Sequence, residues 1–146
     1  MQKTTLTFDE SKSIFTTEIP VLVNNLNYGN HLGYESILTI SQEARMRWLK
    51  ENNMGEMAIA GNIGYLIKNV HVTYEAEAFH GDILNIDIYI ADIKSRSFTI
   101  MYKIANISTN TVIALVSTGH IFYDFSLKKI ARAPDCFKGL VESFIG

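Results

Sequence analysis

The residues best suited to chemistry gather between positions 24 and 43. Residues 24–33 read NNLNYGNHLG, which places four asparagines, two glycines and His31 in ten positions, and Glu43 follows in the next segment. An imidazole changes charge near neutral pH and can move a proton, and a partly buried carboxylate can act as a base. An asparagine amide can orient water or donate a hydrogen bond, but it cannot take a proton near neutral pH. The segment therefore suits a reaction in which a water molecule is held in place and deprotonated.

The sequence predicts a turn followed by a long helix as the support for these side chains. Asparagine and glycine tolerate positive φ, so residues 24–33 are predicted to be a turn. Residues 34–53 are predicted to be a helix because apolar residues recur every three or four positions. The stripe consists of Ile37, Ile40, Ala44 and Trp48, widened by Leu38 and Leu49. The start of such a helix offers unpaired N–H groups and a dipole that favours negative charge.

Strands are predicted on both sides of this helix. Residues 14–23 alternate between apolar and polar positions, and Pro20, which has no N–H, places that strand at a sheet edge or a bulge. Four further strands are predicted at 65–79, 83–93, 98–107 and 111–125, joined by short turns that imply antiparallel neighbours. One helix against such a sheet is a two-layer α+β domain, assigned to residues 1–146 as a single unit. One helix cannot cover all of the apolar sheet, so association through the sheet or its edge is expected.

The segment from Val21 to Leu49 resembles the signature of hotdog-fold acyl-CoA thioesterases, the 4-hydroxybenzoyl-CoA thioesterase-like superfamily. In that family a strand ends in D-x-D/N, a glycine-containing turn and a histidine follow, and a helix then carries E-A-R before an aromatic residue and Leu. Here the corresponding letters are N-L-N, Y-G-N-H and E-A-R-M-R-W-L. The H-G-D turn at 80–82 and the run ALVSTGHIFYD at 114–124 also resemble the later strands of the family.

The resemblance implies an α+β hotdog fold, in which one long central helix is wrapped by an antiparallel sheet, and hydrolysis of an acyl thioester. The implied carrier is coenzyme A or an acyl-carrier protein, with no further cofactor and no metal. Asn27 would position water or the carbonyl, His31 would act as donor or base, Glu43 as base or orienter, and Asn25 as support. The implied substrate-binding residues are Tyr28, Gly29, Asn30, Gly33 and Arg96. Members of the family are commonly dimers or tetramers, so a homodimer or homotetramer is expected.

Other interpretations of the same residues stay open. The family's two acidic positions are Asn25 and Asn27 here, which suits a non-catalytic acyl-binding module, and a hydratase or dehydratase of the same fold is a further alternative. The asparagines could simply form tight turns, and His31 could bond backbone at the helix start. Glu43 precedes Arg47 by four residues, a spacing typical of a helix-surface ion pair. Arg96, with Lys94, Lys128, Lys129 and Arg132, could meet coenzyme A phosphates or be solvated.

Composition narrows the remaining function classes. The net charge of −2 and the lack of a Lys/Arg block argue against a nucleic-acid partner. The single cysteine allows no intrachain disulfide, and no cluster has metal-ligand spacing. No apolar run reaches the roughly 20 residues of a membrane span, and no targeting segment is evident at the start, so no membrane partner and a cytoplasmic location are expected. His120, inside an apolar strand, is expected to be a hydrogen-bonded core residue.

Overall fold

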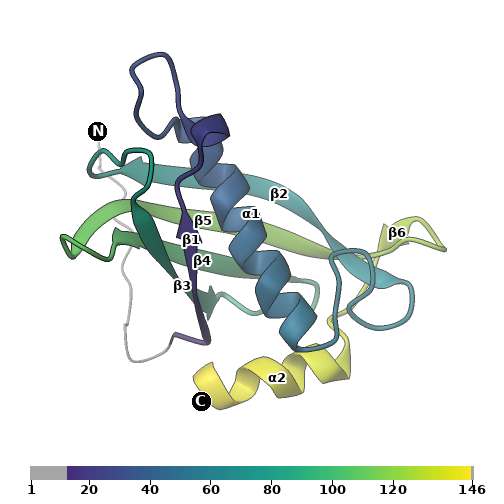
Figure 1. Cartoon of the computed structure of the whole chain (residues 1–146). Coiled ribbons are helices and arrows are strands. Elements are labelled where there is room, and N and C mark those ends of the chain that lie inside the picture. Colours follow the sequence, from purple (N-terminus) through teal and green to yellow (C-terminus); the bar gives the residue numbers. More distant parts are fainter. Residues whose placement is uncertain (1–12, 146) are drawn as a thin grey trace, which may run out of the picture.

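The computed structural model describes residues 13–145, and the fold in this range is one long helix lying across an antiparallel sheet (Figure 1). The strands are β1 (Phe15–Pro20), β2 (Ile63–Tyr74), β3 (Ile83–Ala91), β4 (Ser97–Asn106), β5 (Thr111–Asp124) and β6 (Lys129–Ile130). The helices are the 3-10 turn η2 (Val23–Asn25), the central α1 (Tyr34–Glu51) and α2 (Asp135–Ile145). This arrangement confirms the α+β hotdog fold expected from the sequence.

The sheet has the order β1-β3-β4-β5-β2, with β6 paired to the end of β5. All of its pairings are antiparallel. The strands alternate between buried and partly exposed residues, most regularly in β4, because successive side chains point to opposite faces. Pro20 lies in β1 at one edge of the sheet, as its missing N–H predicts.

Helix α1 buries the predicted stripe against the concave face of the sheet. Ile37, Ile40, Ala44, Trp48 and Leu49 are all buried in the core. The predicted range 34–53 exceeds the observed helix by two residues at its end. Leu38, expected to widen the buried stripe, is instead 39% exposed, because it lies on the helix flank that no other element of the described chain covers.

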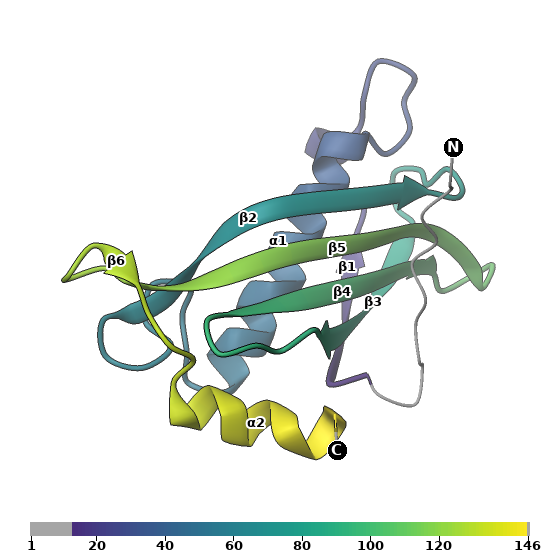
Figure 2. The same cartoon turned by 180° about the vertical axis from the view of Figure 1, so that it is seen from behind.

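Two elements near the end of the chain were not predicted. Strand β6 is a two-residue strand paired with Tyr123 and Asp124. Helix α2 lies across one end of the sheet, beside the C-terminal end of α1 (Figure 2). Its residue Phe137 is fully buried and packs edge-on against Trp48, with ring centroids 6.3 Å apart. Helix α2 therefore closes the end of the core that lies farthest from the 24–33 loop.

Candidate active site

Residues 26–32 form a narrow loop that projects beyond the N-terminal end of α1 (Figure 1). Leu26 and Leu32 face each other across an antiparallel bridge, and the N–H of Asn27 donates to the carbonyl of His31 at 2.9 Å. The N–H of Asn30 returns to the carbonyl of Asn27 at 3.1 Å, and Asn30 has a φ of 62°. The predicted turn is thus confirmed, and Asn30 occupies a left-handed position that asparagine tolerates better than most residues.

The loop brings Asn27, Gly29 and His31 together. Asn27 Oδ1 accepts a hydrogen bond from the N–H of Gly29 at 2.9 Å. A Cβ at Gly29 would lie 2.7 Å from His31 Nε2 and 3.3 Å from Asn27 Oδ1. Those two polar atoms are therefore within about 6 Å of each other, a gap that one water molecule can bridge. Asn27 and Gly29 are exposed and His31 is partly exposed, so solvent can reach both polar side chains.

The start of α1 lies directly beside Asn27. Gly33 is the N-cap, with φ −76° and ψ 150°, and no side chain caps the helix. The Cβ of Asn27 is 3.5 Å from the position that a Cβ on Gly33 would take, and the N–H of Gly33 is tied to the carbonyl of Asn25 at 3.0 Å. Helix geometry leaves the first-turn N–H groups without intrahelical carbonyls, so Tyr34 and Glu35 present donors here. This end of the helix suits a developing negative charge.

Asn25 and Tyr28 take different places. Asn25 Oδ1 accepts the N–H of Leu22 at 2.8 Å, so this side chain holds the turn before the loop. Asn25 also lines a shallow pocket of about 310 Å³ between β1 and α1. Tyr28 lies at the loop tip and is fully exposed. Asn25 is thus a support of the loop, and in a single chain Tyr28 contacts solvent.

Glu43 lies on α1 away from the loop. It is nine residues beyond Tyr34, or about 14 Å along the helix axis. Its Oε2 accepts from Arg47 Nε at 2.7 Å, and Arg47 also donates to Thr17 Oγ1 at 2.9 Å and to the carbonyl of Glu18 at 3.0 Å. This is the helix-surface ion pair that the spacing indicated, and it ties α1 to edge strand β1. Within one chain the structure does not bring Glu43 to His31.

Arg96 also lies far from the loop within one chain. It is in the turn between β3 and β4, where its carbonyl accepts the N–H of Phe122 at 3.0 Å. The loop adjoins the opposite end of β3, since Pro20 pairs with Ile83. The length of β3 separates the two positions by about 27 Å.

A buried polar network under α1 was not recognised from the sequence beyond its expected histidine. Arg45, 2% exposed, donates to the hydroxyls of Tyr65 at 2.7 Å and Tyr102 at 2.9 Å, and to Glu56 Oε1 at 3.2 Å. Burial weakens the preference of this guanidinium for its charged form, but the tyrosines and Glu56 outweigh that effect, so the net result is a raised pKa for Arg45. The family-like E-A-R letters therefore position a buried cation that holds helix and sheet together.

The network continues to His120. Tyr102 Oη is 2.8 Å from Thr118 Oγ1, which is 2.7 Å from His120 Nε2. The imidazole is fully buried, stacks on Phe98 at 4.7 Å, and its Nδ1 has no hydrogen-bond partner. Burial, with a smaller contribution from the charge of Arg45, lowers the pKa of His120 to about 3. His120 is thus a neutral core residue, as expected, and does not reach the loop.

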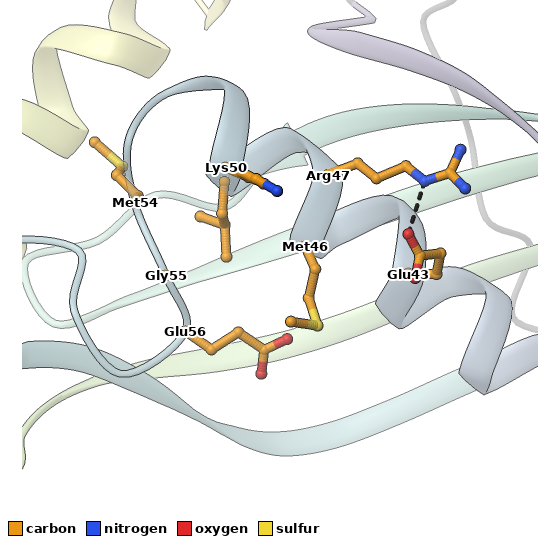
Figure 3. A pocket seen from close by; sticks show the side chains of 8 residues that line it. Glu43, Met46, Arg47, Lys50, Met54, Gly55 and Glu56 are labelled. Atoms are coloured by element: carbon orange, nitrogen blue, oxygen red, sulfur yellow. Dashed lines mark hydrogen bonds and ion pairs between the residues drawn. The ribbon is translucent and has the colours of Figure 1, made fainter.

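A mainly apolar hollow on α1 lies near the helix end rather than at the loop. A pocket of about 530 Å³ is lined by Met46, Met54 and Glu56, together with Glu43, Arg47, Leu49, Lys50 and Gly55 (Figure 3). Met46 and Glu56 point toward one another in this view, whereas Arg47 turns to Glu43 on the other flank of the helix. The pocket thus extends from the exposed surface of α1 to the 54–56 segment, where the carbonyl of Glu56 accepts the N–H of Tyr65 in β2 at 3.0 Å.

The described residues contain neither a cluster of metal ligands nor a helix suited to span a membrane. Among residues 13–145, no group of three or more His, Cys, Asp or Glu side chains is placed to hold a metal ion. None of the helices in this range combines the length and the apolar character that crossing a membrane would require.

Comparison with known proteins places the chain in a wider context. The profile of a family described as the thioesterase-like superfamily matches residues 21–140. No curated protein sequence matches the chain. Similar solved structures are numerous, however.

Three of these structures show the shared fold over most of both chains. The 1,4-dihydroxy-2-naphthoyl-CoA thioesterase of Synechocystis has a TM-score of 0.80 at 19% identity, covering 90% of this chain and 98% of its own. The gentisyl-coenzyme A thioesterase BH1999 has a TM-score of 0.76 at 17% identity, covering 87% and 99%. A Staphylococcus aureus protein solved in complex with CoA has a TM-score of 0.77 at 14% identity, covering 89% and 82%. At these identities the likeness establishes the fold, not the substrate.

Proposed function

The chain belongs to the thioesterase-like superfamily, and we propose that it hydrolyses an acyl thioester at the junction between the 24–33 loop and α1. The observation that carries the proposal is that Asn27 Oδ1 and His31 Nε2 lie within about 6 Å of each other, beside a helix start that no side chain caps. Those groups supply what hydrolysis requires, namely a held water, a proton acceptor and donors for the carbonyl oxygen.

In the proposed reaction, the thioester carbonyl oxygen lies against the first-turn N–H groups of α1. Water held by the amide of Asn27 attacks the carbonyl carbon, and its proton passes to His31 Nε2. The carbon–sulfur bond then breaks, and the proton returns to the sulfur of the leaving group, so the products are a carboxylic acid and a thiol. Gly33 itself is buried, so the substrate would meet the helix start at the exposed residues Tyr34 and Glu35.

We propose coenzyme A as the carrier and an acyl group that can be aromatic. A relative of this fold was solved with CoA, and two others are named for aromatic acyl-CoA substrates. Water is the nucleophile in this reaction, so the proposal includes no cofactor and no metal.

A second copy of the chain would complete the site. Strand β2 is an edge strand whose first residues are covered by the 54–60 segment, which leaves roughly its last nine residues open. Its side chains Ile67, Val70 and Tyr74 are exposed, as are Leu38 and Met46 on the adjoining flank of α1. Long, apolar, unpaired edges favour pairing with another strand.

If two β2 edges paired antiparallel about a two-fold axis, the second copy would exclude water from the 24–33 loop. This pairing would bring the Ile63 end of one copy beside the Tyr74 end of the other. The Met46–Glu56 pocket and the Arg96 turn of the second copy lie at that Ile63 end, so both would approach the loop of the first copy. On this proposal Arg96 meets the phosphates of coenzyme A, and the exclusion of water strengthens the interactions at the helix start.

Thiol release from a panel of aliphatic and aromatic acyl-CoAs tests the proposal, with an Asn27→Asp variant beside the wild type. Turnover that falls in Asn27→Asp would mean that the amide is the working form of this residue. A large gain would mean that the natural chain lacks its base. Absence of turnover with folded protein would favour the hydration or acyl-binding alternatives.

A further inference from the structure

The segment 75–82 runs alongside the catalytic loop and was not recognised as part of a site from the sequence. His31 and Phe79 face each other across an antiparallel bridge, and the N–H of Leu32 donates to the carbonyl of Ala78 at 2.7 Å. The N–H of Ala76 is held by the carbonyl of Ile113 at 3.2 Å. The residue between these two anchored positions is Glu77, whose backbone is therefore fixed relative to the loop.

The carboxylate of Glu77 lies close to the nitrogen assigned as proton acceptor. Its Oε1 is 3.8 Å from His31 Nε2, which is an ion-pair distance rather than a hydrogen bond. The ring of Phe79 stands edge-on to the imidazole, with centroids 6.3 Å apart and planes at 75°, and so limits the positions that the ring can take. Nε2 is also the nitrogen that approaches the Gly29 and Asn27 position. One imidazole nitrogen thus lies between a possible water site and a carboxylate.

The other titratable groups near His31 differ from Glu77 in their contacts, since Asp82 and Tyr74 bind backbone groups. The remaining titratable side chains on the loop and on the segments beside it are Tyr28, Tyr34, Glu35, Tyr74, Glu75, His80 and Asp82. Asp82 Oδ2 accepts the N–H of Phe79 at 2.8 Å, and the hydroxyl of Tyr74 donates to the carbonyl of Leu32 at 2.9 Å. Among the described residues, the carboxylate within 4 Å of the His31 ring nitrogens is that of Glu77.

We infer that Glu77 is a positioning residue for His31 and supplies the negative charge that Asn25 and Asn27 lack. This inference rests on the proposed function. When Nε2 takes the proton of the attacking water, the imidazolium forms beside the Glu77 carboxylate and is paired at once. Glu77 keeps its own charge throughout, and the proton moves from Nε2 to the departing sulfur. The carboxylate therefore favours the transfer without contacting the substrate.

The test is Glu77→Gln, which keeps the size of the side chain and removes its charge. The control is Glu75→Gln, an exposed carboxylate two positions earlier on the same segment. In NMR spectra recorded at one pH, the ring signals of His31 should shift in Glu77→Gln and stay in place in Glu75→Gln, because only the first variant removes the charge beside Nε2. Since Glu77 is largely exposed, raising the salt concentration should shrink the difference.

Activity gives the second measurement. For Glu77→Gln, kcat should fall about three- to tenfold with little change in KM. Glu77→Asp should recover part of the loss, and Glu75→Gln should behave as wild type.

The two measurements separate failure of the inference from failure of the proposed function. Unchanged ring signals of His31 in Glu77→Gln overturn the inference, whether or not the protein is active. Shifted ring signals with an unchanged rate also overturn it, because the ion pair would then have no part in catalysis. If no thioester is hydrolysed, the proposed function fails, and with it the catalytic role of Glu77, whereas the NMR result still decides the ion pair.

Discussion

Replacement of His120 should change how the stability of the protein depends on pH. The imidazole is fully buried between Phe98 and Tyr65, and its Nδ1 has no partner, so a proton on it would be a buried charge without compensation. Its pKa falls from 6.5 to about 3 on folding. A histidine with a lowered folded-state pKa contributes its full stability above pH 6.5, and this contribution is lost as the pH falls toward 3, because the unfolded chain binds the proton first.

The size of the effect follows from the shift. For each pH unit below the unfolded-state pKa, the free energy of unfolding falls by about 1.4 kcal/mol, until the folded-state pKa is reached. Between pH 7 and pH 5, His120 should therefore remove about 2 kcal/mol from the free energy of unfolding. His120→Leu keeps an apolar side chain in the site and cannot titrate. At pH 7 it should lose about 1 kcal/mol, since Thr118 loses one hydrogen bond.

Urea unfolding at pH 7 and pH 5 measures this difference. Between pH 7 and pH 5, the free energy of unfolding of the wild type should fall by about 2 kcal/mol more than that of His120→Leu. His80→Gln, which removes an exposed imidazole, controls for the loss of a histidine elsewhere. Equal losses of unfolding free energy in the wild type and His120→Leu would mean that His120 carries no buried-charge penalty.

Three further predictions follow from the packing, the loop and the open edge. Trp48→Ala should lower the free energy of unfolding by about 3–5 kcal/mol and Tm by roughly 10 °C. Met46→Ala, at an exposed position of the same helix, should change Tm little. A Tm shift of only a degree or two in Trp48→Ala would contradict the core position of Trp48. Gly29→Ala should place a methyl group 2.7 Å from His31 Nε2 and reduce the rate of hydrolysis by roughly 100-fold with Tm nearly unchanged. Gly55→Ala, whose methyl group would meet no atom within 4 Å, should keep its activity. A fully active Gly29→Ala would argue against His31 as the proton acceptor. Val70→Asp should dissociate the proposed dimer, as measured by light scattering after gel filtration. Ile130→Asp, at a similarly exposed position on β6, should leave the dimer intact. An oligomer unaffected by Val70→Asp would exclude the β2 edge as its interface.

The helix, the loop and the central strands could be predicted because their signals are local. The three- and four-residue spacing of Ile37, Ile40 and Ala44 predicts α1, and the asparagines of 24–33 predict a turn. Helix α2 was missed because it is short and contains Gly139, although Phe137 and Val141 have helical spacing and both are buried. The buried cation of Arg45 was missed because only folding brings the tyrosines of β2 and β4 to it.

The candidate site was predictable only where its members are neighbours in sequence. Asn27, Gly29, His31 and Gly33 come together through one loop, as the sequence indicated. Glu77 reaches His31 through a bridge between segments some forty-six residues apart, which no local pattern reveals. Glu43 is close to the loop in sequence but not in space, because it lies farther along the axis of α1, where it pairs with Arg47.

The most direct test of the central claim is the rate of thiol release from the best acyl-CoA of a panel by the wild type and by His31→Ala. The wild type should turn over, and a folded His31→Ala should lose about 100-fold or more in kcat, as expected when a general base is removed. Equal rates for the two proteins would mean that the loop histidine has no part in the reaction.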